Sequence, residues 1–473
     1  VVPSAVKNKG ANDTEWQSDF RFFNPCGEDL DVRIEYQPEG VNNTGVELLS
    51  RSFQMSADES RVFADIVDAI PALGAEERTG SVRIESESDS GCKVLSVSRT
   101  YNETPFGTLG LFVPALPVKA ATGDLLEITG LIHNASYRSN VRLVNFGDED
   151  VWVRLKPIHR NGDVINDGRS ALVPGHSTRQ VNNVASWTGI DGNLAPFTIR
   201  IETGGADVEA TATIVDNISG DSVLYQSSFL DENVIWVVGA AHNFGVNDSQ
   251  WRTDLWLFNP TDDWLGGQLE YVVGDSPGDQ FGFQWPTMVT LGSRQYLDVV
   301  GTLMGGQESA GYMILTGEDG DPAPQIAART YNLDLTGGTY GLNLRVFGSD
   351  DLLAPGETGY IAGISSSATK EDGFRTNLGL LNTDQDGWTG VAVTLYRLDG
   401  SVLATKQLNI APGVLRQFDV FKFLGVAGET MKASIKVEVL SGGGVAAYAT
   451  EVDNRTQDSI FIPAQKVFMG AAR

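Results

Sequence analysis

Basic residues are scarce in this 473-residue chain. Its 34 lysines and arginines stand against 61 aspartates and glutamates, which gives a formal net charge of -27. Such an excess of negative charge is repelled by phosphate backbones and anionic lipids, so nucleic acid and acidic membrane surfaces are disfavoured as partners. Long apolar runs are also lacking, since no stretch reaches the length of a membrane-spanning helix. The sequence therefore predicts no nucleic-acid partner and no membrane insertion.

Cysteine is almost absent: only Cys26 and Cys92 are present, both in the first quarter of the chain. Two such residues could be free buried thiols, but a lone pair in an exported protein favours a disulfide bond. The chain begins at Val1, without the basic segment and apolar core of a signal peptide, which fits either an exported chain after processing or a trimmed sequence. We therefore expect a secreted or cell-surface protein with a Cys26–Cys92 disulfide.

Histidine is also scarce, and the residue patterns of common active sites are missing. The chain has four histidines and contains no His-Glu-x-x-His, Gly-x-Ser-x-Gly or Cys-x-x-Cys pattern, nor a glycine loop for phosphate. His133 and His242 occupy matching positions in the repeats described below, which favours a structural role. A glycosidase pair of carboxylates has no fixed spacing in sequence and stays open. The prediction is a protein that is not an enzyme.

What the sequence does contain is a repeated phrase. Its fullest copy, residues 251–260, reads WRTDLWLFNP, and weaker copies occupy residues 16–25, 137–145 and 374–382. The copies share an aromatic residue, then Arg or Gln, Ser or Thr, and Asp or Asn, followed by apolar residues in alternation and a closing asparagine. Alternation with period two is typical of a half-buried strand. The phrase therefore predicts the same strand four times.

The spacing of the phrase predicts the domain organisation. The closing asparagines are Asn24, Asn145, Asn259 and Asn382, and repeats of about 115 residues match the usual size of one domain. Each repeat continues with several short alternating strands separated by turn residues, the pattern of a β-sandwich with few helices. The predicted fold class is all-β, with four tandem β-sandwich domains at residues 1–118, 119–230, 231–355 and 356–473, hereafter repeats one to four.

Alternate repeats share further motifs. Repeats one and three carry Arg-Thr-Tyr-Asn followed by Gly-Thr-x-Gly, at residues 99–102 and 107–110 and at residues 329–332 and 338–341. Repeats two and four instead carry Val-Asp-Asn followed by Asp-Ser, at residues 215–217 and 221–222 and at residues 452–454 and 458–459. The chain is therefore predicted to be a duplicated pair of domains, arranged A-B-A-B.

The repeated phrase resembles one found in tandem β-sandwich regions of bacterial secreted and cell-surface proteins, and the strand count is similar to that of immunoglobulin-like and fibronectin-like modules. The resemblance covers the whole chain as four copies. It implies a β-sandwich fold and an extracellular setting, and it implies no particular activity.

Calcium is the ligand that the acidic turns suggest most directly, because this ion binds six to eight oxygens supplied by such loops. The same turns are equally explained as solvated surface, and none matches the full twelve-residue EF-hand pattern. The candidate ligands are Asp262, Asp263, Asp319, Asp321, Asp384 and Asp386.

Tryptophans and the two ends of the chain are the candidate contact residues. Trp256 lies out of register with the apolar positions of its phrase, so we expect it at a domain junction or on the surface, and Trp264 is a second candidate. Exposed tryptophans stack on sugar rings or on protein partners. The apolar ends, with Val1 and Val2 at one and Phe461 at the other, are candidates for pairing with the open sheet edge of a neighbouring copy.

These observations predict a non-enzymatic extracellular structural protein, a subunit that associates with copies of itself or with other cell-surface proteins in a filament or surface layer. Repeated faces favour head-to-tail contacts, which propagate when the rotation does not close. The alternative is an adhesin that recognises carbohydrate or another surface through tryptophans and acidic loops.

Overall fold

Antiparallel strands dominate the protein, and its helices are single turns. The computed structural model describes residues 1–10, 14–70, 73, 77–117, 124–227, 230–245, 249–275, 280–333 and 337–467. Several separate antiparallel sheets are present, so the predicted all-β class is confirmed. Within the described residues, no helix is both long and apolar enough to cross a membrane.

The elements follow one another in the same sequence in each repeat. Repeat one contains β1 (Val2–Lys9), β2 (Glu15–Phe23), β3 (Leu30–Pro38), β4 (Ser50–Met55), β5 (Ser60–Phe63), α1 (Ile66–Ala69), β6 (Arg78–Glu87), β7 (Leu95–Thr104) and β8 (Gly107–Pro114). Repeat two contains β9 (Leu125–His133), β10 (Tyr137–Asn145), β11 (Val151–His159), β12 (Arg169–Val173), β13 (Ser177–Val181), α2 (Val184–Trp187), β14 (Leu194–Glu202), β15 (Val208–Asp216) and β16 (Ser222–Gln226).

The second half of the chain runs through the same series with small additions. Repeat three contains β17 (Val234–Phe244), β18 (Gln250–Phe258), β19 (Leu265–Val273), β20 (Gln280–Met288), β21 (Ser293–Tyr296), α3 (Val299–Leu303), β22 (Ser309–Gly317), η4 (Glu318–Gly320), β23 (Gln325–Leu333), β24 (Thr339–Asn343), β25 (Val346–Phe347) and η5 (Ser349–Asp351). Repeat four contains β26 (Thr358–Ser366), β27 (Phe374–Asn382), β28 (Thr389–Tyr396), β29 (Val402–Ile410), β30 (Leu415–Asp419), α4 (Val420–Leu424), β31 (Thr430–Ser441), β32 (Val445–Asp453), β33 (Ser459–Pro463) and β34 (Gln465–Lys466).

Sheet order repeats along with element order. In repeat two, one sheet runs β12-β11-β14-β9 and the other β13-β10-β15-β16, and repeat four has the corresponding orders β29-β28-β31-β26 and β30-β27-β32-β33. The strands of repeats one and three follow the same two orders. In these repeats, however, β1 and β17 each pair with one strand from each of the two sheets and so join the sheets into one longer sheet. The repeated phrase forms β2, β10, β18 and β27, each paired on both edges.

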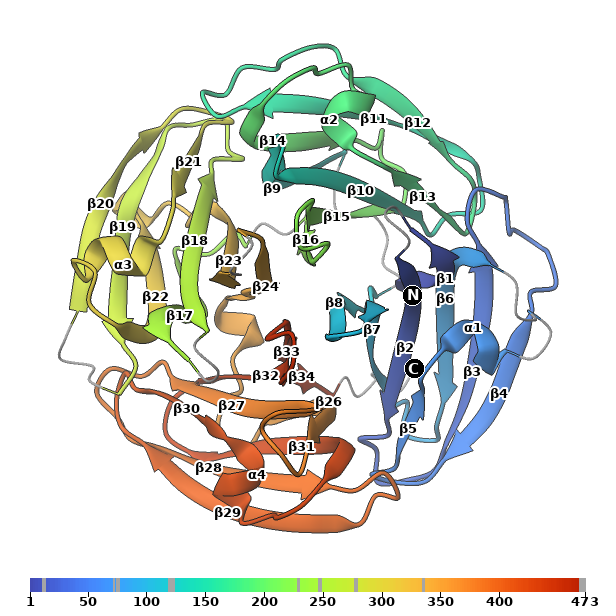
Figure 1. The fold of residues 1–473 in the computed structure, drawn as a ribbon, viewed down its shortest axis with the longest axis vertical. Coiled ribbons are helices and arrows are strands. Elements are labelled where there is room, and N and C mark those ends of the chain that lie inside the picture. Colours follow the sequence, from blue (N-terminus) through green and yellow to red (C-terminus); the bar gives the residue numbers. More distant parts are fainter. Residues whose placement is uncertain are drawn as a thin grey trace. The chain divides into compact units, whose positions relative to one another are not determined.

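The chain folds into two compact units that do not follow its order. Unit 1 comprises Val1–Pro38, Val46–Pro117 and Asp351–Arg473, and unit 2 comprises Glu39–Gly45 and Val118–Asp350. Repeat one therefore packs with repeat four in unit 1, and in Figure 1 the strands β8 (cyan) and β33 (red) lie next to each other. Repeats two and three pack together in unit 2, where β16 lies next to β24. The first predicted domain boundary, at residues 118 and 119, lies outside the described residues, and the other boundaries stay predictions.

The closing asparagine explains why each phrase ends where it does. Asn259 is buried, and its side-chain amide donates hydrogen bonds to the carbonyls of Asp263 (2.7 Å) and Met288 (3.1 Å). Its Oδ1 accepts from the backbone N–H of Thr261 (3.0 Å). One side chain thus holds the turn after its strand to the end of a neighbouring strand. The same bonds recur at Asn24, Asn145 and Asn382.

Both end segments belong to sheets of their own chain. Strand β1 pairs with β2 on one edge and with β6 on the other, and Val2 is buried opposite Val82. The amino group of Val1 donates to the Leu116 carbonyl at 2.7 Å. Phe461 in β33 is buried and stacked on Tyr448, with ring centroids 4.6 Å apart. Pairing of these segments with a neighbouring copy is therefore not favoured, because the intramolecular partners already occupy β1 and bury β33.

Replacing Asn259 by alanine tests the asparagine bond set. The substitution leaves two carbonyls and one N–H without their partner, of which the Met288 carbonyl is buried, at about 1–3 kcal/mol for each group that water does not reach. We expect a loss of about 3 kcal/mol in the free energy of unfolding, measured by denaturant titration. Asn409→Ala, at an exposed position of β29, is the matched control and should change stability by less than about 0.5 kcal/mol. Equal losses in the two variants would contradict this role.

Candidate functional site

Two aspartates of repeat two hold an edge strand of repeat three in unit 2. Asp216 Oδ2 accepts both the backbone N–H (2.9 Å) and the hydroxyl (2.8 Å) of Thr339, and Asp221 Oδ2 accepts the N–H of Gly341 (2.8 Å). The other oxygen of Asp216 accepts the N–H of Ile218 (2.7 Å) and so shapes its own turn. Each carboxylate bond of this kind contributes roughly 1.5–3 kcal/mol, more than a neutral hydrogen bond does. We call this arrangement the aspartate clasp.

Repeat four makes the same clasp on repeat one in unit 1. Asp453 Oδ2 accepts the N–H (2.9 Å) and the hydroxyl (2.8 Å) of Thr108, and Asp458 Oδ2 accepts the N–H of Gly110 (2.8 Å). Arg99 adds a charged donor, with Nη2 3.0 Å from Asp458 Oδ2. Both aspartates are buried, at 5% and 0% exposure. The junction between the last and first repeats is thus built like the junction between two consecutive ones.

The clasp explains the motifs that alternate along the sequence. Val-Asp-Asn with Asp-Ser supplies the acceptors, and Gly-Thr-x-Gly supplies the donors. Glycine is required at the last position of the donor motif, because a side chain at Gly110 or Gly341 would overlap the neighbouring strand. The sequence displays both halves of the contact at fixed offsets but does not say that they meet. The signal in the sequence that could have indicated this contact is that the acceptor motif and the donor motif occur in alternate repeats.

Trp256 fills the space beneath the clasp in unit 2. Its side chain is 1% exposed and lies in one apolar cluster with Leu131, Ile214 and Ala327. Gly130 makes room for it: a side chain there would overlap Ala327, and the residue has a φ of +78° that disfavours other residues. Trp256 therefore lies at a junction between repeats two and three and not on the surface.

Arg21 occupies the matching phrase position in unit 1. Its Nη1 donates to the Gly363 carbonyl (2.7 Å) and to Glu451 Oε2 (2.9 Å), and its Nη2 donates to Asp19 Oδ2 (3.0 Å). The side chain is 1% exposed. Gly363 resembles Gly130, with a φ of +77° and space that Arg21 fills. A buried ion network thus takes the place of the apolar packing around Trp256.

Removing the Arg21 cation should be costly. Arg21→Met keeps the length of the side chain but leaves Asp19 and Glu451 buried without it, and breaking such pairs costs about 3–5 kcal/mol. We expect a loss of that size in the free energy of unfolding of unit 1. Arg33→Met is the control, because Arg33 is half exposed in its ion pair with Glu35 and such pairs contribute about 0–1 kcal/mol. Similar small losses in both variants would show that the Arg21 network is not stabilising.

The same network predicts a pH dependence. Burial alone would raise the pKa of Glu451, but Arg21 and Lys432 outweigh it and hold that pKa below the ordinary value of 4.5. The pKa of Asp19 is lowered in the same way. The unfolded chain therefore takes up protons first as the pH falls, so stability is present above about pH 4.5 and is lost as the pH falls through the lower folded-state values. Glu451→Gln should be less stable at pH 7 and lose less between pH 5 and pH 3 in denaturant titrations, and parallel losses would contradict it.

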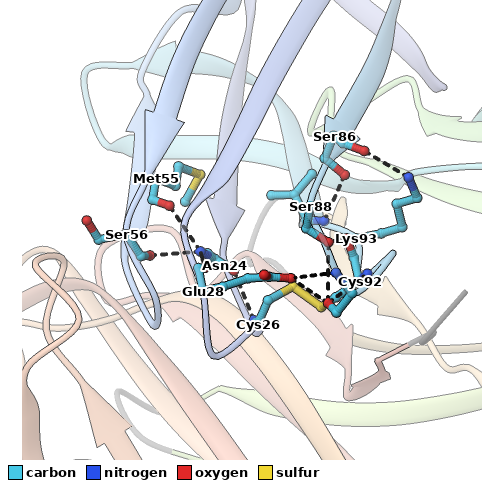
Figure 2. The surroundings of a disulfide bond; sticks show 11 residues. Asn24, Cys26, Glu28, Met55, Ser56, Ser86, Ser88, Cys92 and Lys93 are labelled. Atoms are coloured by element: carbon cyan, nitrogen blue, oxygen red, sulfur yellow. Dashed lines mark hydrogen bonds between the residues drawn. A yellow bond between two sulfur atoms is a disulfide. The ribbon is translucent and has the colours of Figure 1, made fainter.

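The predicted disulfide between Cys26 and Cys92 is confirmed. It joins the turn after β2 to the turn between β6 and β7, as Figure 2 shows, with the two Cα atoms 6.0 Å apart. Asn24 accepts the Cys26 N–H (2.9 Å), and Glu28 Oε1 accepts the Ser90 N–H (3.0 Å), so both turns are fixed independently of the sulfurs. A cross-link over 66 residues stabilises the folded state by roughly 4 kcal/mol in the chain-entropy account. Disulfides of this kind are typical of proteins outside the reducing cytosol.

A cavity of about 580 Å³ lies beside this disulfide. The charged residues that line it are engaged with their neighbours. Glu357 pairs with Lys466 at 2.8 Å, and Glu28 accepts from the Ser90 hydroxyl at 2.5 Å. The cavity therefore presents paired charges and does not suggest a class of ligand.

The calcium candidates lie in separate turns. Asp384 Oδ1 accepts the N–H groups of Asp386 (2.9 Å) and Gly387 (3.1 Å), so that turn is closed by its own carboxylate. The carbonyls of Asp262, Asp263 and Asp321 likewise accept bonds from nearby side chains, and Asp319 lies in η4. Among the residues that the structure describes, no group of three acidic, histidine or cysteine side chains is gathered to hold a metal ion. Calcium stays a prediction from sequence.

Three tryptophans stand out from the surface at related positions. Trp264 (70% exposed) and Trp388 (64%) immediately precede β19 and β28, and Trp152 (67%) is the second residue of β11. Each follows the turn that a closing asparagine holds, so each indole is carried by a fixed turn rather than by a long loop. We call these residues the tryptophan corners. Trp264 was a candidate contact residue from the sequence, and its exposure leaves it available for contact.

One of the two matching histidines, His242, contacts the residue that caps a single-turn helix. The Nδ1 of His242 is 2.8 Å from Asp298 Oδ2, and Asp298 caps the N-terminus of α3 by accepting from Gly301. Lys7 takes this place in repeat one, where it pairs with Asp65, the cap of α1. The feature that His242 and Lys7 share is therefore a contact with the aspartate that caps a single-turn helix.

Comparison with known proteins gives no family. No protein-family model matches the chain, and no curated protein matches it at a significant level.

Proposed function

We propose that this protein is a non-enzymatic extracellular structural protein, a subunit that associates with copies of itself in a filament or surface layer. The main support for this proposal is the set of tryptophan corners, because three of the four repeats present an exposed tryptophan next to a fixed turn. Exposed tryptophan is among the residues most enriched at the energetic centres of interfaces. A rigid support reduces the entropy that a contact loses on binding.

The proposal includes the finer organisation that the sequence suggests: four β-sandwich domains in the order A-B-A-B, each built around one copy of the phrase. The recurrence of strand order and of the asparagine bonds supports it. The buried residues that the repeats share serve folding, as the clasps and asparagines illustrate. The exposed residues, the tryptophan corners among them, are then the ones that contact partners.

The support for a purely structural role also comes from how the polar residues are used. Asp216, Asp221, Asp453 and Asp458 are buried and bonded in the clasps. The buried carboxylates Asp19 and Glu451 are bonded to Arg21. Carboxylates held in this way stabilise contacts between repeats and are not exposed to a substrate.

Carbohydrate binding is the second candidate, and a specific observation favours it. The tryptophan corners lie beside acidic turns, at Asp148 to Asp150, at Asp262 and Asp263, and at Asp384 and Asp386. An exposed indole flanked by carboxylates fits the stacking face and the hydroxyl groups of a sugar. Such a protein would be an adhesin for polysaccharide or for another surface.

One set of variants separates the two candidates. Trp152→Ala/Trp264→Ala/Trp388→Ala removes the corners, and Phe106→Ala/Phe244→Ala removes exposed aromatics elsewhere. We expect wild-type and phenylalanine-variant protein to associate as concentration rises in sedimentation velocity, and the tryptophan variant to stay monomeric, a shift of at least tenfold in the dissociation constant. Wild-type protein that is monomeric at all concentrations would overturn the proposal. Specific binding of that monomer to a glycan array, lost in the tryptophan variant, would establish the second candidate.

A further inference from the structure

The two clasps differ in their place along the chain, but the bonds from their aspartates to the threonine and glycine of the neighbouring strand are the same. In unit 2 the clasp joins repeats two and three, which are neighbours in sequence. In unit 1 it joins repeats four and one, the two ends of the chain. The secondary bonds match as well: Ser219 Oγ donates to the Thr339 carbonyl at 2.8 Å, and Thr456 Oγ1 donates to the Thr108 carbonyl at 3.0 Å.

A further contact accompanies each clasp. The hairpin after β11 places the Arg160 carbonyl where it accepts the N–H of Ser293 at 2.8 Å, and the hairpin after β28 places the Leu398 carbonyl on the N–H of Ser60 at 2.8 Å. Both donors begin the short strand that follows the turn, β21 in repeat three and β5 in repeat one. Repeat four therefore contacts repeat one in the same way as repeat two contacts repeat three.

We propose that the contact between repeat four and repeat one is exchangeable between copies, so that Asp453, Asp458 and Glu451 of one molecule engage Thr108, Gly110 and Arg21 of a second. An element that makes the same bonds within or between copies exchanges without loss of contacts, which is the basis of domain swapping. The partner is a second copy of this chain. The inference rests on the proposed self-association and names a surface for it that is separate from the tryptophan corners.

The buried residue beneath each clasp gives the exchange its specificity. Glu451 lies two residues before Asp453 and pairs with Arg21, whereas Ile214 lies two residues before Asp216 and shares an apolar cluster with Trp256. Repeat four placed on repeat three would bury Glu451 without a cation, which is strongly unfavourable. Repeat four therefore selects repeat one of the second copy. The resulting contact is head-to-tail and extends into a chain of molecules unless it closes.

A cysteine lock tests the proposal. The hydroxyls of Ser60 in repeat one and Ser434 in repeat four are buried and 2.8 Å apart, so Ser60→Cys/Ser434→Cys places a disulfide across the junction. Ser18→Cys/Thr100→Cys is the matched control, because those hydroxyls are 2.9 Å apart and both lie in repeat one. Each protein is concentrated near its unfolding midpoint in denaturant, returned to buffer, and measured by light scattering after size-exclusion chromatography.

We expect wild-type protein, the oxidised control and the reduced lock to yield dimers and larger species. The oxidised lock should yield at least tenfold fewer. Equal oligomer content in the oxidised and reduced lock would overturn the proposal, and so would wild-type protein that returns only as monomer. Because reduction also opens Cys26–Cys92, wild-type protein reduced in the same way is the folding control for the reduced lock. The tryptophan-corner variant should still exchange, so failure of the corners and failure of the exchange are distinguishable.

A mixing experiment provides a second measurement. Asp453→Ala/Asp458→Ala removes the clasp aspartates from repeat four and leaves repeat one intact. Arg99→Ala/Thr108→Val weakens the matching side of repeat one and leaves repeat four intact. Treated together as above, the two should form mixed dimers that do not grow further, because only one intact junction is possible per pair. Mixed dimers no more abundant than the dimers of each variant treated alone would contradict the exchange.

Discussion

A buried aspartate that divides its two oxygens between its own turn and a neighbouring strand is the interaction on which this structure depends. Asp216 and Asp453 each use Oδ1 to hold the turn that follows and Oδ2 to accept two donors from a threonine in another repeat. Folding of the turn and docking of the repeat are therefore coupled through one carboxylate. Because the group is buried, its bonds are not weakened by competition with water, and loss of the donors would leave a charge without solvation.

The closing asparagines perform the corresponding task within each repeat. Asn145 and its equivalents connect the turn that follows their own strand to the end of another strand through one amide. The two devices explain why the recurring polar residues of this chain are buried, an arrangement that is unusual for asparagine and aspartate. The exposed tryptophans are carried by the turns that these asparagines hold, next to the acidic turns that contribute to the net charge of -27.

Local pattern predicts much of this structure from sequence. Alternation in the phrase predicts β2, β10, β18 and β27, since strand periodicity depends on near neighbours. The pairing of Cys26 with Cys92 followed from their isolation. The meeting of repeat four with repeat one did not follow, because the A-B-A-B pattern is equally compatible with a linear array of domains. Partners far apart in sequence leave no periodic trace, and the complementarity of Asp453 with Thr108 becomes visible only when the two strands are placed together.

The position of Trp256 illustrates the same limit in one residue. Its register in the phrase placed it opposite Leu255 and Leu257, on the face away from the core of its own repeat. That face is covered by repeat two, where Gly130 opens the space. Register therefore predicts the side of the sheet, but burial depends on a neighbour that a single repeat does not encode. The ends of the chain show the same limit. Their apolar residues Val2 and Phe461 suggested pairing between molecules, but both lie in strands that pair within their own chain.

The first and last repeats are joined by the same clasp as the second and third. Amide hydrogen exchange in the native state measures this directly at Thr108 and Gly110, with Thr339 and Gly341 as internal references. We predict strong protection of all four amides, and loss of protection at Thr108 and Gly110 alone in the Asp453→Ala/Asp458→Ala variant. Rapid exchange of Thr108 and Gly110 in wild-type protein, beside protected Thr339 and Gly341, would contradict the account.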